Sequence, residues 1–95
     1  MTSDTHDLKD QLTTLFEQAG KAHHAAFATV DGADAEWPIW YAEYLMDKLP
    51  SLLGATFTKS ELVYLLVRLS KEQALDAPGA KWPRYYAKFF VDHYA

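Results

Sequence analysis

The chain has 95 residues, which is enough for one domain with a modest core but too few for separate catalytic and regulatory domains. With 49% hydrophobic and 23% charged residues, it has the composition of a folded globular protein rather than of a disordered segment. The formal net charge of -4 argues against binding to nucleic acid, because the chain lacks the positive charge that attracts phosphate groups.

The sequence carries no sign of membrane insertion or export. Its apolar stretches are far shorter than the about 20 residues that cross a membrane. The start of the chain, 1–7, is polar and acidic, without the basic end and the apolar middle of a secretory signal. We therefore expect a cytoplasmic protein that does not bind membranes. The absence of cysteine excludes disulfides, thiolate metal sites and thiol nucleophiles.

Apolar residues near the N-terminus recur at helical spacing and predict an amphipathic helix over 5–30. They are Leu8, Leu12, Leu15, Phe16, Ala19, Ala22, Ala26, Phe27 and Val30. Ser3 or Asp4 is expected to cap the helix. Gly20 interrupts the pattern at a cost of about 1 kcal/mol relative to alanine, so we expect either a break or a close helix contact there. Turn residues without periodicity predict a loop at 31–36.

Three further helices are predicted, over 37–49, 59–75 and 82–94. Proline suits the first turn of a helix, where its missing N–H is not needed, so Pro38 and Pro83 mark two of the starts. Pro50 is expected to end the helix over 37–49, and 51–54 then forms a tight connection.

The helix over 59–75 has a specific start signal and an apolar stripe. Thr58 and Glu61 are spaced as a capping box, in which each side chain satisfies a backbone N–H of the other residue. The stripe consists of Leu62, Leu65, Leu66 and Leu69. Val63, Tyr64 and Val67 extend the apolar surface around a second side. A helix with two apolar sides lies centrally in the fold or contacts a partner chain.

Aromatic residues make up 15% of the chain, and most of them fall in two similar segments, 37–49 and 82–94. When these segments are aligned, Trp, Pro, Tyr, Ala and Asp recur in the same places. Two tandem helix-loop-helix units would explain the similarity, as would convergence, because Trp-Pro begins helices well. Either origin predicts an all-α fold: a compact four-helix bundle built from the two units, which a pseudo-twofold axis could relate, with 1–95 as a single helical domain.

Several polar residues are expected on apolar faces. Lys48 and His93 occupy equivalent places in the two aromatic segments. They could hold an anionic or aromatic ligand, but cations in a last helical turn also complement the helix dipole and pack along rings, and we favour that structural role. His23 falls within the apolar stripe of the first helix. It could act in acid-base chemistry, although a core histidine is more often a hydrogen-bonded packing residue.

The sequence contains no established pattern for a metal or for catalysis. Adjacent histidines on a helix point about 100 degrees apart, so His23 and His24 are not expected to bind one metal together. Asp31 and Asp34 lack the ligand spacing of a calcium-binding loop and are interpreted as helix-end and turn residues. We assign no catalytic residue, metal or cofactor, and consider an enzyme, with His23 as its base, only as a third hypothesis.

Two functions follow from the excess of apolar and aromatic surface. The first is a non-enzymatic interaction or assembly module, expected to be a homodimer, because a short chain cannot enclose every large side chain. Its contact residues would be Val63, Tyr64, Val67, Ile39, Trp40, Met46 and Val91. The alternative is a protein that binds a small apolar or aromatic molecule between helices. Its rings would be Trp37, Trp40, Tyr41, Trp82, Tyr85 and Tyr86, with polarity from His23, Lys48 and His93.

Overall fold

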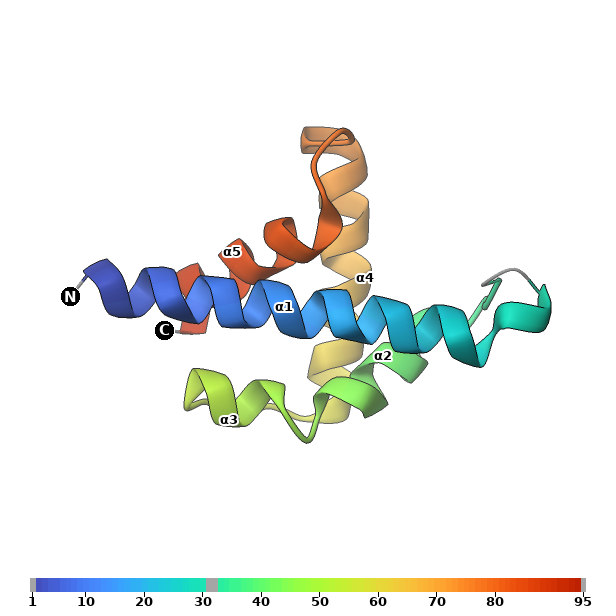
Figure 1. Ribbon diagram of the computed structural model, residues 1–95, viewed down its shortest axis with the longest axis horizontal. Coiled ribbons are helices and arrows are strands. Elements are labelled where there is room, and N and C mark those ends of the chain that lie inside the picture. The colour runs from blue at the N-terminus through green and yellow to red at the C-terminus, as the bar shows by residue number, and fades with distance from the viewer. Residues whose placement is uncertain (1, 31–32, 95) are drawn as a thin grey trace.

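The computed structural model describes residues 2–30 and 33–94. Within these ranges the chain is helical and contains no β-strand, which confirms the all-α class (Figure 1). The elements are α1 (Thr2–Ala26), the 3-10 helix η1 (Ala28–Val30), α2 (Trp37–Leu45), α3 (Leu49–Leu53), α4 (Lys59–Asp76) and α5 (Trp82–Tyr94).

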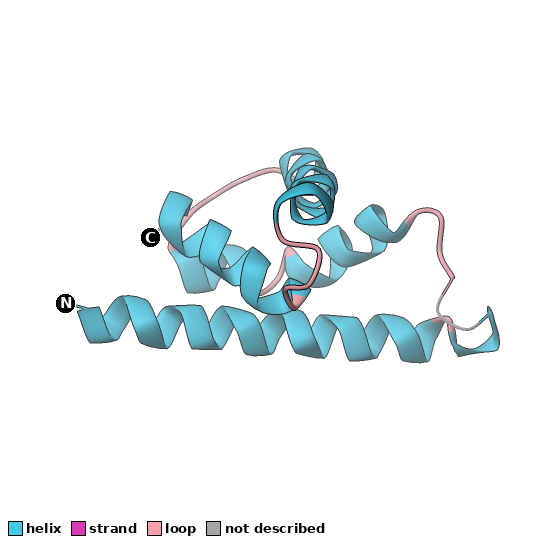
Figure 2. Cartoon of the chain, turned by 90° about the horizontal axis from the view of Figure 1, so that it is seen from above, coloured by secondary structure: helices cyan, strands magenta, loops and turns pink. Residues whose placement is uncertain are grey.

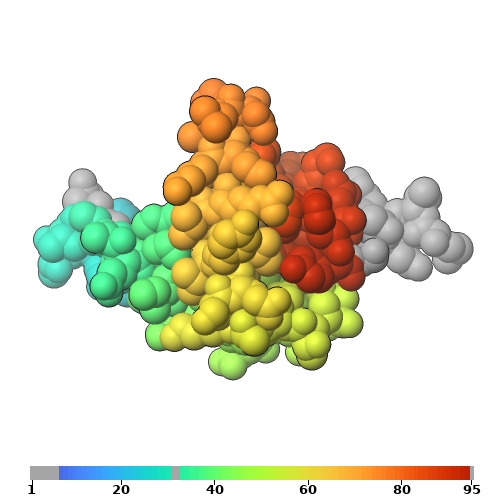
Figure 3. Space-filling view, turned by 180° about the vertical axis from the view of Figure 1, so that it is seen from behind, coloured from blue at the N-terminus to red at the C-terminus, as the bar shows by residue number. Residues whose placement is uncertain are grey.

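α1 runs along the length of the molecule, and the other α-helices pack on one side of it (Figures 1 and 2). It packs most extensively against α5, and α4 packs against α2. α4 crosses α1 steeply: it stands upright in Figure 1 and is seen end-on in Figure 2. From behind, α4 lies between α2 and α5 (Figure 3). The helices form a compact globule, but a four-helix bundle of tandem units is not confirmed.

α1 begins at Thr2, ahead of the residues that were expected to cap it, and its backbone continues through Gly20 without a break. It ends at Ala26, earlier than the predicted 30, and the chain then tightens into η1. The backbone N–H of Phe27 still bonds to the carbonyl of His23 at 3.1 Å, but that of Val30 bonds to Phe27. This change to shorter-range bonding is typical of a helix terminus.

The predicted helix over 37–49 is divided into two, which corrects both its end and the tight connection expected at 51–54. α2 stops at Leu45, and α3 then begins at Leu49. A single helix cannot continue through Pro50, because proline has no N–H to donate and its ring clashes with the carbonyl four residues earlier. Proline is tolerated in a first turn, so the chain turns and starts again. Gly54, with φ of 63°, ends α3 in the left-handed conformation.

α4 begins as predicted from its capping box. The Thr58 hydroxyl accepts the backbone N–H of Glu61 at 3.0 Å, and the Glu61 carboxylate accepts that of Thr58 at 2.8 Å. All four leucines of the predicted stripe are buried, with at most 8% of their surface exposed. Val63 and Val67 are half-buried, and only Tyr64 on the second apolar side is well exposed.

The core lies where α1 meets α5 and the leucine stripe of α4. Phe16 of α1 stacks on Phe90 of α5 with ring centroids 5.8 Å apart, and both rings are fully buried. Small residues allow the neighbouring backbones to approach, as Ala19 and Ala87 are also fully buried. This packing fixes α5 across the middle of α1, and the site described below lies at one end of the contact.

Candidate functional site

A partly open cavity of about 260 Å³ lies between α1, α2, α4 and α5. One acidic and one basic side chain line it, and the rest of the lining is aromatic or apolar. The lining residues are Phe16, His23, Asp34, Trp37, Tyr41, Leu66, Trp82 and Tyr86. An open groove on the surface shares His23, Tyr41 and Trp82 with the cavity, so these three side chains lie at its border with the surface.

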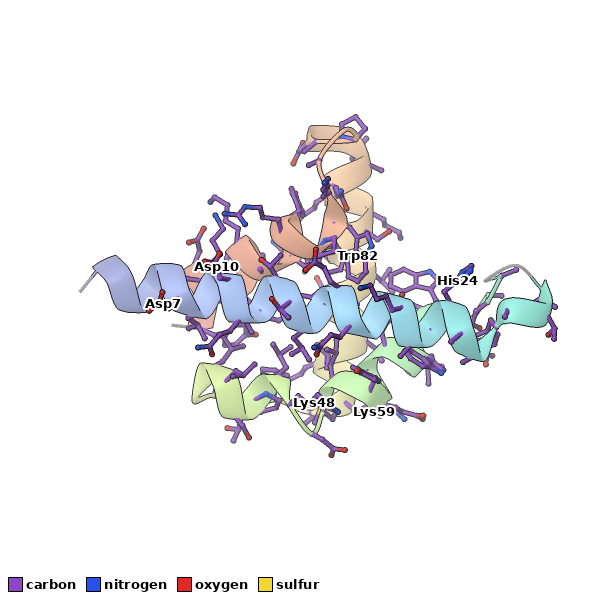
Figure 4. All side chains as sticks on the ribbon, viewed as in Figure 1. Asp7, Asp10, His24, Lys48, Lys59 and Trp82 are labelled. Atoms are coloured by element: carbon purple, nitrogen blue, oxygen red, sulfur yellow. The ribbon has the colours of Figure 1, made fainter. Side chains whose placement is uncertain are left out.

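Gly20 allows α5 and α2 to approach α1 at this site. A Cβ atom at Gly20 would lie 3.1 Å from the Trp82 ring and 4.0 Å from the Tyr41 hydroxyl. The first distance is shorter than an ordinary van der Waals contact between carbon atoms. Figure 4 shows Trp82 beside the middle of α1. The close helix contact expected at this glycine is therefore confirmed, and Trp82 is the residue that makes it.

Edge-to-face contacts arrange the rings around the cavity. Trp37 and Tyr41 on α2 have centroids 6.0 Å apart and planes inclined by 77°. Trp82 and Tyr86 on α5 form the equivalent contact at 5.3 Å and 73°. Tyr41 and Trp82 join the two pairs at 5.7 Å and 78°. Each successive plane is nearly perpendicular to the last, so the rings border the cavity from several directions.

His23 and Asp34 form a buried pair at the edge of these rings. Asp34 Oδ2 accepts a hydrogen bond from His23 Nε2 at 3.0 Å, and the two side chains are only 10% and 11% exposed. The imidazole also stacks on Tyr41 with centroids 4.9 Å apart. The second carboxylate oxygen, Oδ1, accepts the backbone N–H of Glu36 at 3.0 Å. Asp34 thus closes the turn before α2 and attaches this turn to α1.

The two tyrosine hydroxyls of the cavity are uncharged near neutral pH. Burial raises the pKa of Tyr86 to about 12, despite a hydrogen bond with Ser70 that lowers it. Burial, and secondly the negative charge of Asp34, also raise the pKa of Tyr41. Both phenols are therefore neutral polar groups, beside the His23–Asp34 pair, in a lining that is otherwise apolar.

The structure brings together part of the predicted ligand-binding set. Trp37, Tyr41, Trp82, Tyr86 and His23 all line the one cavity. Trp40 is outside the lining, with its ring 5.0 Å from that of His23 and stacked on Tyr44 at 5.5 Å. Tyr85 is also outside it and contacts the ring of Tyr86 at 6.4 Å.

Lys48 and His93, the other polar residues of that set, lie away from the cavity and pack against nearby rings. Lys48 Nζ lies over the Tyr44 ring, 4.5 Å from its centroid, and Figure 4 shows Lys48 well separated from Trp82. The His93 ring stacks on Phe89 at 4.1 Å, and its Nδ1 lies 3.0 Å from the Phe89 carbonyl oxygen. Both residues thus pack along rings, as the favoured structural role expected, but only His93 lies in a last helical turn, since Lys48 lies in the turn between α2 and α3.

The sequence did not identify Asp34, Phe16 or Leu66 as members of the site. Asp34 was interpreted only as a turn residue, and Asp31, considered with it, lies outside the described residues. One signal pointed to Asp34: a histidine within an apolar stripe needs a polar partner, and the following loop supplies acidic residues. Phe16 and Leu66 carry no such signal, because their patterns are those of ordinary core residues.

The residues proposed for a protein interface differ in accessibility. Tyr64 is 62% exposed and Ile39 is 44% exposed, so both are free to contact a partner. Val63, Val67 and Met46 are half-buried. Val91 lies in the core of a single chain at 5% exposed, which corrects its assignment to an interface.

Within residues 2–30 and 33–94, no group of three or more histidine or acidic side chains is placed to hold a metal ion. No helix in that part of the chain combines the length and apolar character needed to cross a membrane. Comparison of the chain with protein-family models, with curated proteins and with solved structures found no match.

Proposed function

We propose that the protein binds a small apolar or aromatic molecule in the cavity between α1, α2 and α5, and that it does so without catalysing a reaction. The observation that supports this is the cavity itself, lined by perpendicular rings and holding one buried histidine–carboxylate pair. Ligand sites are usually concave and apolar, with a few polar groups that orient the ligand. At about 260 Å³, this cavity is slightly smaller than most ligand sites, so it suits a small ligand.

Tryptophan fluorescence tests this function, because Trp37 and Trp82 line the cavity. Cyclohexanol is a suitable first probe, since it is apolar, small and does not absorb at the excitation wavelength. We expect a saturable change in emission. Trp37→Leu should weaken binding, because it removes one wall, whereas Trp40→Leu, on the same helix but outside the lining, should retain it. A purely linear response in the wild-type protein would refute the proposal.

A second function, assembly into a homodimer, is favoured by the exposure of Tyr64 on α4 and Ile39 on α2. Large exposed apolar side chains often mark contact surfaces. Light scattering at micromolar concentration should then give twice the mass of the chain, and Tyr64→Glu should give a monomer. Gln18→Glu is the control, since Gln18 is an exposed polar residue on α1 that belongs to no proposed contact surface. A monomer at every concentration would exclude assembly.

We also propose that the two aromatic segments, 37–49 and 82–94, are the second helices of two tandem copies of one helix-loop-helix unit. The proposal is supported because residues at matching positions of the two segments have similar surroundings. Trp37 and Tyr41 of the first segment line the cavity, as do Trp82 and Tyr86 at the matching places of the second. Their edge-to-face contacts have nearly the same geometry, with planes inclined by 77° and 73°.

A further inference from the structure

The charge of the cavity lining limits the ligands that it can accept. Among the described residues of the lining, Asp34 is the one carboxylate and His23 the one basic group. The lining therefore carries no net positive charge. Because the Tyr41 and Tyr86 hydroxyls keep their protons near neutral pH, they add no charge. A cation or a neutral molecule suits such a lining, and an anion does not.

The rings around the cavity supply a second attraction for a cation. The face of an aromatic ring is negative, and cations within about 6 Å of a ring centroid are attracted to it, most strongly by tryptophan. Here two tryptophans and two tyrosines stand in sequence, with neighbouring planes inclined by 73° to 78°. All four rings line the same cavity, so a cation inside it lies close to several of them.

The hydrogen bonding of Asp34 indicates what kind of cation fits. Oδ2 already accepts from His23, and Oδ1 already accepts from the backbone of Glu36. Each carboxylate oxygen thus keeps one lone pair, so Asp34 supplies negative charge and only a limited capacity to accept further hydrogen bonds. A primary ammonium has three N–H donors and is strongly hydrated, so moving it from water into a lining made mostly of rings is costly. An ammonium whose hydrogens are replaced by methyl groups avoids this cost and offers apolar surface to the rings.

On the basis of the ligand-binding function proposed above, we propose that the natural ligand is an organic cation with a methylated ammonium group, held between Trp37, Tyr41, Trp82 and Tyr86 near the carboxylate of Asp34. The group could belong to a free small molecule or to a methylated lysine side chain, since both present the same chemistry to the rings.

The test compares two probes of the same shape by fluorescence titration of the wild-type chain: choline, and 3,3-dimethylbutan-1-ol, in which carbon replaces the charged nitrogen. We expect choline to bind at least about tenfold more tightly. Equal affinities would overturn the cation inference but leave the proposed function intact. If cyclohexanol binds but neither choline nor 3,3-dimethylbutan-1-ol does, the cation inference is wrong and the proposed function is still supported. If none of the three probes binds, both the cation inference and the proposed ligand-binding function are wrong.

A variant that removes the charge of Asp34 tests whether this carboxylate attracts the cation. Asp34→Asn keeps the shape of the side chain but removes its charge, so choline should lose about tenfold more affinity than 3,3-dimethylbutan-1-ol does. Asp92→Asn on the exposed side of α5 is the matched control and should bind both probes as the wild type does. If Asp34→Asn lowered the affinity for both probes equally, Asp34 would have only a structural role in the site. If that variant does not fold, the wild-type comparison still decides the inference.

A peptide of glycine and serine with one trimethyllysine separates the two sources of the cation. If the peptide binds more tightly than choline, the ligand is a methylated protein segment, and if it binds more weakly, the ligand is a free small molecule. The same peptide with unmodified lysine should bind at least about tenfold more weakly than its methylated form. Equal binding of the two peptides would contradict the argument from the cost of removing N–H donors from water.

Discussion

The His23–Asp34 pair should stabilise the whole fold, because it joins the turn before α2 to α1. Asp34→Ala removes the acceptor of the His23 hydrogen bond and also the acceptor that closes the turn at Glu36. With the two side chains of the pair only 10% and 11% exposed, water cannot fully replace the lost partner. The variant should therefore unfold more easily than the wild type.

The size of this effect follows from the geometry. A hydrogen bond to a charged group contributes about 1.5 to 3 kcal/mol, and the 3.0 Å contact is of ordinary length. Including the weaker bond to the exposed Glu36 N–H, we expect Asp34→Ala to lower the free energy of unfolding by about 2 to 3 kcal/mol. For a domain of this size, that loss corresponds to a decrease of roughly 10 to 20 °C in the midpoint of thermal unfolding.

Urea and thermal unfolding followed by circular dichroism measure the loss, and a double-mutant cycle assigns it. In a His23→Phe background, Asp34→Ala no longer breaks the pair and should cost about 1 to 2 kcal/mol less than in the wild type. Asp92→Ala is the control, as this exposed carboxylate pairs only with Lys88, and it should leave the midpoint unchanged. If the cost of Asp34→Ala were the same in both backgrounds, the pair would not hold the turn to α1.

Three other predictions concern alkaline stability, a helix cap and the core. Because burial raises the pKa of Tyr86 from 10.0 to about 12, its neutral form stabilises the fold below pH 10.0, and this stability is lost as the pH rises towards 12. Urea unfolding should show a loss of about 2 to 3 kcal/mol over that interval, reduced in Tyr86→Phe but not in the exposed Tyr64→Phe. Thr58→Ala removes the capping box and should cost about 1 kcal/mol in thermal unfolding, whereas Thr56→Ala, in the preceding loop, should cost nothing measurable. Phe90→Ala leaves a cavity in the core and should cost about 3 to 5 kcal/mol in urea unfolding; a loss below 1 kcal/mol would mean that the ring is not buried.

The agreement between sequence and structure is best where neighbouring residues decide the conformation. The capping box of Thr58 and Glu61 and the start of α5 at Trp82 were both predicted to the residue. The division of the second helix was missed although its cause is local. Pro50 was interpreted as an end signal alone, and the same residue is equally suited to the first turn of α3.

The candidate site was predicted in its composition but not in its assembly. The aromatic segments pointed to Trp37, Tyr41, Trp82 and Tyr86, which all line the cavity. The same pattern also included Trp40, Tyr85, Lys48 and His93, because helical periodicity places residues on a face only to within the breadth of that face. Which part of each face contacts another helix depends on how the two helices cross.

The sequence by itself determined the all-α class, most helix starts and the leucine stripe of α4, since these depend on residues within a few positions of each other. Only the tertiary structure decided that the rings of α2 and α5 surround a cavity and that His23 pairs with Asp34. Both results depend on the crossing of α1, α2 and α5, which is set by contacts between distant parts of the chain, such as Trp82 against Gly20. The sequence thus contains the many aromatic residues, but only tertiary packing brings four of them together around one cavity.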